Sequence, residues 1–269
     1  MYWQLELLLF ILGAIVGSFL NVCIYRLPLG QSIVFPASHC MACETRIHWY
    51  DNIPVLAWLW LRGRCRHCQA QISIQYPIVE TLAGVLAVIV YFKFGLTRES
   101  LALLVLGYAL IVLTIIDLYH YILPDVITKP GIVLGMLLAM QPLVGLPPLG
   151  SPFATLQNAA IGAFWGYWGL WLFAWLFEKI TGKVGMGMGD VKLLSMVGAW
   201  FGWQALPFTL FGGAFLGSIV GVLLILFARH DRSQPIPFGP YLAGSAWLYV
   251  LYGDVLTDWY WQRFVVGWP

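Results

Sequence analysis

The sequence predicts an all-α integral membrane protein with about eight transmembrane helices and a small polar domain between the first two. Of its 269 residues, 61% are apolar and 10% are charged, whereas a soluble domain carries about 25% charged residues. The apolar residues gather in long runs, and a helix needs about 20 such residues to cross a bilayer. One long polar stretch, residues 26–77, interrupts these runs and holds four of the five cysteines.

Eight apolar runs are candidate transmembrane helices. They lie at residues 5–25, 78–94, 100–117, 125–141, 156–178, 190–203, 206–228 and 240–256. The sixth run is short and the seventh follows it closely, so this hairpin is the least well defined. The first run resembles a signal peptide in length. A signal peptide would begin with Lys or Arg, whereas residues 1–5 contain neither and Glu6 follows them, so we interpret the run as a retained span.

Positively charged residues orient these spans, because cytoplasmic loops carry an excess of Lys and Arg. On one side lie Arg26, Arg46, Arg62, Arg64, Arg66, Lys179, Lys183, Lys192, Arg229 and Arg232, and on the other Lys93, Arg98 and Arg263. We therefore expect both termini outside the cell and residues 26–77 inside it. The net charge of +2 gives no reason to expect a nucleic-acid partner.

The chain is thus divided into a first transmembrane helix (1–25), a cytoplasmic four-cysteine domain (26–77) and a membrane domain (78–269). The cysteines form two CxxC pairs, Cys40 with Cys43 and Cys65 with Cys68. Four thiolates at nearly this spacing bind one tetrahedral zinc ion. A domain of about 50 residues also needs such a support. We expect a structural Zn²⁺ site.

Other interpretations of these cysteines are a pair of disulfides or unmetallated thiols, although disulfides are rare in the cytoplasm. His39 or His67 is a further candidate for one ligand position. Cys23, in the first span, is interpreted as a small packing residue.

Two aspartates lie at the ends of apolar runs. Asp117 closes the third run, and Asp190 opens the sixth after the glycine-rich sequence GMGMG. A charge in the membrane costs about 2.5 to 3.5 kcal/mol, so such residues are functional candidates. The predicted topology places both at the cytoplasmic edge, where two close carboxylates share one proton, as in an aspartic protease. Helix dipoles would make Asp190 the ionised base and leave Asp117 protonated.

Simpler roles exist for Asp190 and Asp125, but not for Asp117, because a carboxylate is disfavoured at a helix C-terminus. Asp190 is a suitable N-cap for the helix that follows it, and Asp125 for the helix after Pro124. Asp125 is also the main rival for membership of the pair, and Glu80 and Glu178 are the other acids near the membrane.

Three other classes of function are compatible with parts of the sequence. A proton-linked transporter would place its acids in mid-helix and show internal repeats, which we do not find. A zinc-bearing docking scaffold would not need the aspartates. A metalloprotease would need an open zinc site, and the sequence has no HExxH motif.

Six blocks of the sequence resemble the bacterial prepilin peptidases, or type IV leader peptidases. They run from the first predicted span to the last. The blocks are GSFLNVCIYRLP at 17–28, the CxxC pairs with YDNIP at 50–54, YPIVE at 76–80, IDLYHYILPD at 116–125, GMGMGDVKLL at 185–194 and PIPFGPYLA at 235–243.

The resemblance implies an intramembrane aspartyl protease of the GxGD type in the bacterial inner membrane. Asp117 and Asp190 would form its dyad. Asp125, Gly187, Gly189 and Lys192 match accessory or substrate-groove positions. Its substrates would be type IV prepilins or type II secretion pseudopilins, cut at the cytoplasmic edge after a glycine that precedes an apolar helix.

Many members of the family also methylate the new N-terminus, with S-adenosylmethionine as methyl donor. By position in the cytoplasmic loop, the candidates for holding the donor are Asp51, Asn52, Pro54 and Gly63. The chain departs from some relatives in its compact first loop and in the segment at 142–152. The PIPFGPYLA block is expected either to line the substrate groove or to mark a helix start.

Overall fold

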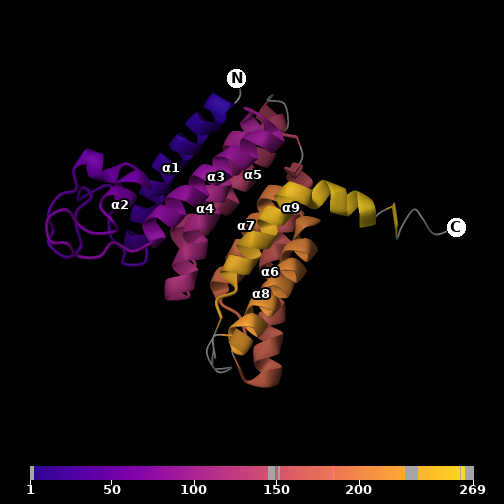
Figure 1. The fold of residues 1–269 in the computed structure, drawn as a ribbon. Coiled ribbons are helices and arrows are strands. Elements are labelled where there is room, and N and C mark those ends of the chain that lie inside the picture. The colour runs from indigo at the N-terminus through magenta and orange to yellow at the C-terminus, as the bar shows by residue number, and fades with distance from the viewer. Residues whose placement is uncertain are drawn as a thin grey trace. The chain divides into compact units, whose positions relative to one another are not determined.

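The computed structural model describes residues 3–144, 149–150, 152–183, 185–227, 236–260 and 262–263. These residues form helices and loops, with two isolated β-bridges and no strand (Figure 1). The predicted all-α class is therefore confirmed for the described chain. Arg229 and Arg232, which supported the predicted orientation, lie outside the described residues.

The chain forms two compact units, Met1–Ile116 and Asp117–Pro269. The first unit contains α1 (Trp3–Arg26), the 3₁₀ turn η1 (Trp49–Asn52), α2 (Leu56–Trp60), α3 (Gln75–Phe94) and most of α4 (Arg98–His120). The second contains α5 (Asp125–Ala139), η2 (Gln141–Val144), α6 (Leu156–Thr181), α7 (Met188–Phe201), α8 (Ala205–Phe227) and α9 (Gly239–Tyr260). Each predicted apolar run falls largely within one helix: α1, α3, α4, α5, α6, α7, α8 or α9.

Five of these helices are long and apolar enough to cross a membrane: α1, α3, α4, α6 and α8. Two others, α5 and α7, have 15 and 14 residues, fewer than the roughly 20 that a span needs. Multiple membrane-spanning helices are therefore supported, while the number eight stays a prediction.

In the first unit, α1 packs along α3 (Figure 1). A Cβ atom at Gly17 would lie 2.7 Å from the Cα of Glu80, and one at Gly13 would lie 2.6 Å from the carbonyl oxygen of Ala83. Glycines on one face let two helix backbones approach closely, as is common in membrane proteins. The amide of Asn21 adds a hydrogen bond to the Tyr76 carbonyl (3.1 Å).

In the second unit, α7 is the central helix. It contacts α5, α6, α8 and α9, and 11 of its 14 residues are buried. A Cβ atom at Gly198 would lie 2.3 Å from the Gly162 carbonyl oxygen of α6, so these two backbones touch. A helix that is apolar on all sides is a buried helix, which explains why α7 is so uniformly apolar.

The segment between α4 and α5 differs in detail from expectation. Helix α4 continues to His120, so Asp117 lies in its last turn rather than at its end. Pro124 is the N-cap of α5 and makes no side-chain capping bond, and Asp125 is the first helical residue. The prediction that Asp125 caps this helix is wrong, because proline already supplies the extended backbone before the first turn.

Candidate functional site: an aspartate pair and a four-cysteine loop

Both candidate catalytic aspartates are buried in the second unit. Asp117 is 5% exposed and Asp190 is 8% exposed. Their carboxyl groups interact electrostatically with each other. Buried carboxyl groups without full charge compensation are characteristic of reactive sites, because a structural role would normally come with a paired cation.

Asp117 is held by the start of another helix. The backbone N–H of Gly239, the first residue of α9, donates a hydrogen bond to Oδ2 of Asp117 over 3.0 Å. Sequence reasoning had not singled out Gly239, although it lies in the PIPFGPYLA block. The contact joins residues 122 positions apart, so no local pattern could have revealed it.

Asp190 also lies at a helix start, but it is not the N-cap. Gly187, in an extended conformation, is the N-cap of α7, and Asp190 is the third helical residue. The capping interpretation of Asp190 is therefore wrong. Because Asp117 accepts from the first turn of α9, both carboxylates meet a helix N-terminus. Asp117 also lies in the last turn of α4, where the helix dipole disfavours a negative charge, so the assignment of the ionised role to Asp190 stays a prediction.

Leu123 lies between the start of α7 and the start of α9. It is 7% exposed, and a Cβ atom at Gly189 would lie 2.8 Å from the Cβ atom of Leu123. A Cβ atom at Gly239 would lie 3.2 Å from Cδ1 of the same side chain. The glycines of the GxGD motif and of α9 therefore make room for one leucine beside the aspartate pair.

Asp125 is engaged by two lysines. Its carboxylate forms ion pairs with Nζ of Lys192 (2.5 Å) and with Nζ of Lys129 (2.7 Å). Lys192 lies two residues after Asp190 on α7, so the pair ties the start of α5 to the helix that carries a catalytic candidate. A carboxylate neutralised by two ammonium groups is a poor proton acceptor, which separates Asp125 from the buried pair.

The four cysteines converge in the first unit. The Sγ atoms of Cys40, Cys43, Cys65 and Cys68 all lie within 4.8 Å of one another. The sulfur atoms of Cys40 and Cys68 are 3.8 Å apart, which matches the roughly 3.8 Å between thiolates bound at 2.3 Å to one tetrahedral zinc ion. His39 and His67 are outside this cluster.

The two CxxC segments have the same local geometry. Cys40 donates its backbone N–H to Thr45 (2.9 Å), and Cys65 donates its own to Ala70 (2.8 Å). The residue four positions after each first cysteine, Glu44 or Gln69, has a positive φ. Hydrogen bonds to the side chain and backbone of Thr45 lower the pKa of the Cys43 thiol to about 6. A backbone hydrogen bond at Ala70 lowers the pKa of the Cys68 thiol, but desolvation and the neighbouring thiols together raise it to about 11, because four sulfurs this close cannot all ionise without a cation between them. The geometry of the cluster is therefore suited to a metal ion, which would compensate the thiolate charges.

Three of the four methyl-donor candidates have structural partners. Arg66 donates bidentate hydrogen bonds to Asp51, from Nη2 to Oδ1 (2.6 Å) and from Nε to Oδ2 (2.9 Å). This guanidinium holds the pKa of the Asp51 carboxyl below its usual value. Asn52 accepts from the Ser18 hydroxyl at 3.5 Å, and the Pro54 carbonyl accepts from the Leu56 N–H.

Glu80 anchors the same loop to α3. Its buried carboxylate accepts a hydrogen bond from the Val55 N–H over 2.7 Å. Val55 has a φ of 61°, a conformation that β-branched residues rarely adopt. Glu80 thus has a structural partner, which favours an anchoring role over a catalytic one.

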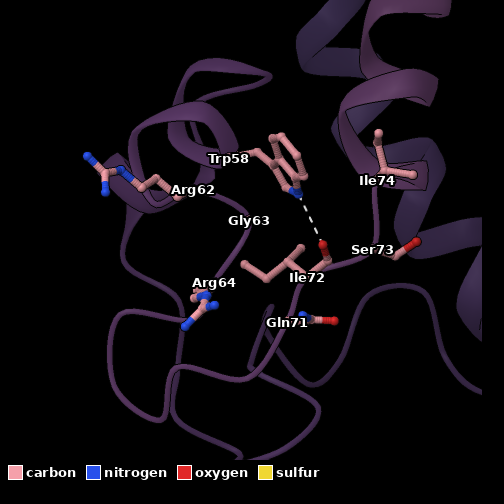
Figure 2. A pocket seen from close by; sticks show the side chains of 8 residues that line it. All are labelled: Trp58, Arg62, Gly63, Arg64, Gln71, Ile72, Ser73 and Ile74. Atoms are coloured by element: carbon pink, nitrogen blue, oxygen red, sulfur yellow. Dashed lines mark hydrogen bonds between the residues drawn. The ribbon is translucent and has the colours of Figure 1, made fainter.

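Gly63, the fourth donor candidate, lines a pocket of about 510 Å³. The other lining residues are Trp58, Arg62, Arg64, Gln71, Ile72, Ser73 and Ile74 (Figure 2). The indole N–H of Trp58 donates to the Ile72 carbonyl over 3.1 Å, which fixes the ring beside Gly63. This volume lies in the range of small-molecule sites, and the pocket includes none of Asp51, Asn52 and Pro54.

Two family models match the chain. Residues 11–94 match the bacterial peptidase A24 N-terminal domain. Residues 104–222 match the type IV leader peptidase family. The first match contains the four-cysteine loop, and the second contains both buried aspartates.

Curated relatives are similar over nearly the whole chain. A prepilin leader peptidase/N-methyltransferase of Aeromonas hydrophila is 42% identical, covering 98% of this chain and 96% of the relative. Proteins of the same name from Stutzerimonas stutzeri and Pseudomonas aeruginosa are 38% and 39% identical, each over 94% of this chain and 92% of the relative. No solved structure matches.

Proposed function

Since this chain belongs to the type IV leader peptidase family, we propose that it cleaves the leader of prepilins or pseudopilins and then methylates the new N-terminus. Its relatives are named prepilin leader peptidase/N-methyltransferase, and they match this chain over nearly their full length. The single observation that carries the proteolytic mechanism is the burial of Asp117 and Asp190 in the second unit, where Gly239, the partner of Asp117, and Gly189, the neighbour of Asp190, both pack against Leu123.

The proposed reaction needs one ionised and one protonated aspartate. The ionised carboxylate takes a proton from water, the resulting hydroxide attacks the scissile carbonyl carbon, and the other aspartate protonates the carbonyl oxygen. The tetrahedral intermediate then expels the amine, which takes a proton from the first carboxyl, while one hydroxyl of the intermediate returns its proton to the other aspartate as the carbonyl re-forms. Helix N-termini at both residues allow either of them to carry the charge.

Asp125 and Lys192 are proposed to support this site without exchanging protons with substrate. Their ion pair fixes the start of α7 beside the loop after α4. Gly187 and Gly189 are proposed to lie at the substrate groove. An added Cβ at Gly187 would meet no atom closer than 3.6 Å, so the backbone there is open to a peptide, whereas Gly189 packs against Leu123.

Substitution of the aspartates tests the dyad. We expect Asp117→Asn and Asp190→Asn each to lower prepilin cleavage by at least about 10²-fold, because each loses a general acid or base. Asp125→Asn should retain measurable cleavage. The measurement is leader removal in membranes that contain equal amounts of each variant.

The matched control is methylation of a pilin whose leader has already been removed, which should survive in both dyad variants. Cleavage at the wild-type rate by either Asn variant would contradict the dyad.

The metal held by the four cysteines is proposed to be structural Zn²⁺. All four positions of a tetrahedral ion would be filled by Cys40, Cys43, Cys65 and Cys68, so no position is open for a substrate. The ion would hold the loop between α1 and α3 together and take no part in proteolysis.

Replacing one ligand tests this proposal. We expect Cys65→Ser to lower the zinc content of the purified protein from one ion per chain and to lower its melting temperature, because a structural ion contributes to folding. Elemental analysis and thermal unfolding measure the two effects. Cys23→Ser, a change of a buried cysteine outside the cluster, is the control and should keep its zinc. Full zinc content in Cys65→Ser would exclude the four-thiolate site.

S-adenosylmethionine is proposed to bind in the pocket around Gly63 rather than at Asp51, Asn52 or Pro54. When bound, the donor supplies an electrophilic methyl group to a free amine. Trp58 offers an aromatic surface, and the guanidinium groups of Arg62 and Arg64 suit a carboxylate. Asp51 is occupied by Arg66 and is proposed to be structural.

Changes at two glycines of the same loop test this site. Gly63 has a φ of +66°, and an added Cβ would lie 2.8 Å from Cζ2 of Trp58. Gly30 has the same φ with no atom within 4 Å. We expect Gly63→Ala to lose donor binding and methylation, while Gly30→Ala and Asp51→Asn keep both. Donor affinity is measured by calorimetry. Equal affinity in wild type and Gly63→Ala would place the donor elsewhere.

We propose a location in the bacterial inner membrane with eight spans, both termini periplasmic, and the active site at the cytoplasmic edge. The arginine-rich loop before α3 supports this orientation. The domain boundaries expected from sequence, 1–25, 26–77 and 78–269, belong to the same proposal.

Reporter fusions test the topology. An alkaline phosphatase fused after residue 269 should be active, and one fused within residues 26–77 should be inactive, because the enzyme folds outside the cytoplasm. Activity measurements on cells expressing each fusion decide the orientation. The opposite pattern would reverse it.

A further inference from the structure

We infer that Gly239 is a positioning residue for proteolysis: its N–H and its lack of a side chain together fix Asp117 in its reactive place. The inference rests on the proposed dyad. It assigns a role to the PIPFGPYLA block, which sequence analysis left between a groove lining and a helix start.

The hydrogen bond from Gly239 to Asp117 uses a backbone N–H that has no acceptor within its own helix. The first N–H groups of a helix have no partner within the helix. In α9, Pro240 has no N–H, and Tyr241 and Leu242 donate to the carbonyl of Phe238. The N–H of Gly239 is directed instead at Oδ2 of Asp117 over 3.0 Å, and both residues are buried. One oxygen of the carboxyl group is thereby fixed, while the other is not part of this bond.

Position 239 requires glycine because there is no room for a side chain, and not because of its backbone conformation. Its φ lies outside the left-handed region, so an alanine could adopt the same backbone. A Cβ atom there would lie 2.6 Å from Oδ2 and 3.2 Å from Cγ of Asp117. Real Cβ atoms do not come this close to other atoms, so any side chain at 239 would displace the carboxyl group.

The carboxyl group of Asp117 lies in a packed interior, since this residue is 5% exposed. Leu123 lies against Gly239, with Cδ1 3.2 Å from the added Cβ position, and its Cβ atom closes the space at Gly189. Interiors packed at this density transmit displacements to their neighbours. A shift of about 1 Å in a reacting group can cost about 10²-fold in rate.

Gly239→Ala tests the inference in the full-length protein. We expect kcat for prepilin cleavage to fall by about 10²-fold with KM within about twofold, because Asp117 is displaced while the substrate still binds. Methylation of a pilin whose leader has already been removed should stay at the wild-type rate.

Gly244→Ala is the matched control on the same helix. A Cβ atom there would meet only Cδ1 of Leu216, at 4.0 Å, so both activities should be unchanged. A double variant, Gly239→Ala with Leu123→Val, removes the Cδ1 contact and leaves the contact with Asp117. It should remain as slow as Gly239→Ala.

Each contrary result has a distinct meaning. If Gly239→Ala cleaves at the wild-type rate while Asp117→Asn does not cleave, the inference fails and the dyad stands. If Asp117→Asn itself cleaves, both fail. Recovery in the double variant would assign the effect to Leu123 packing, and parallel loss of methylation would assign it to folding. Either result would overturn the positioning role.

Discussion

Burial of two carboxyl groups in an apolar bundle constrains the whole second unit. A charged group removed from water is stable only where donors or opposite charges replace its hydration. Asp117 and Asp190 have no arginine or lysine partner among the described ion pairs. Helix N-termini take that place: Asp190 lies in the first turn of α7, and Asp117 receives the first N–H of α9. The ends of these helices must therefore meet at one point.

That meeting point requires unusually close backbones. Helix α7 is surrounded by four helices, and it reaches α6 through contacts between Gly162 and Gly198. Near the aspartates, Gly189 and Gly239 leave room for Leu123. Larger residues at these positions would separate the helices and move the carboxyl groups apart. Glycine here serves close approach, since neither Gly189 nor Gly239 needs a left-handed backbone.

The four-cysteine loop is stabilised in a different way from the helices of the second unit. It has little apolar interior, and each CxxC segment forms the same tight turn closed by a backbone hydrogen bond. Two such turns bring four thiols together without regular secondary structure around them. The ion pair of Asp51 with Arg66 and the bond from Val55 to Glu80 then attach the intervening YDNIP segment to the rest of the first unit. Polar contacts, together with the metal ion proposed for the four thiols, would thus replace a hydrophobic core.

The sequence alone predicted the apolar helices, the grouping of the four cysteines, and the position of two aspartates at the ends of apolar runs. These features follow from local properties: apolar run length, CxxC spacing, and a charge beside an apolar run. The tertiary structure decided which partners each side chain meets. The bond from Gly239 to Asp117 spans 122 positions and that from Lys192 to Asp125 spans 67. It also pairs the Asp51 carboxylate with Arg66, which no local pattern indicates. Such contacts depend on how helices pack, and helix packing is a property of the whole bundle rather than of any one segment.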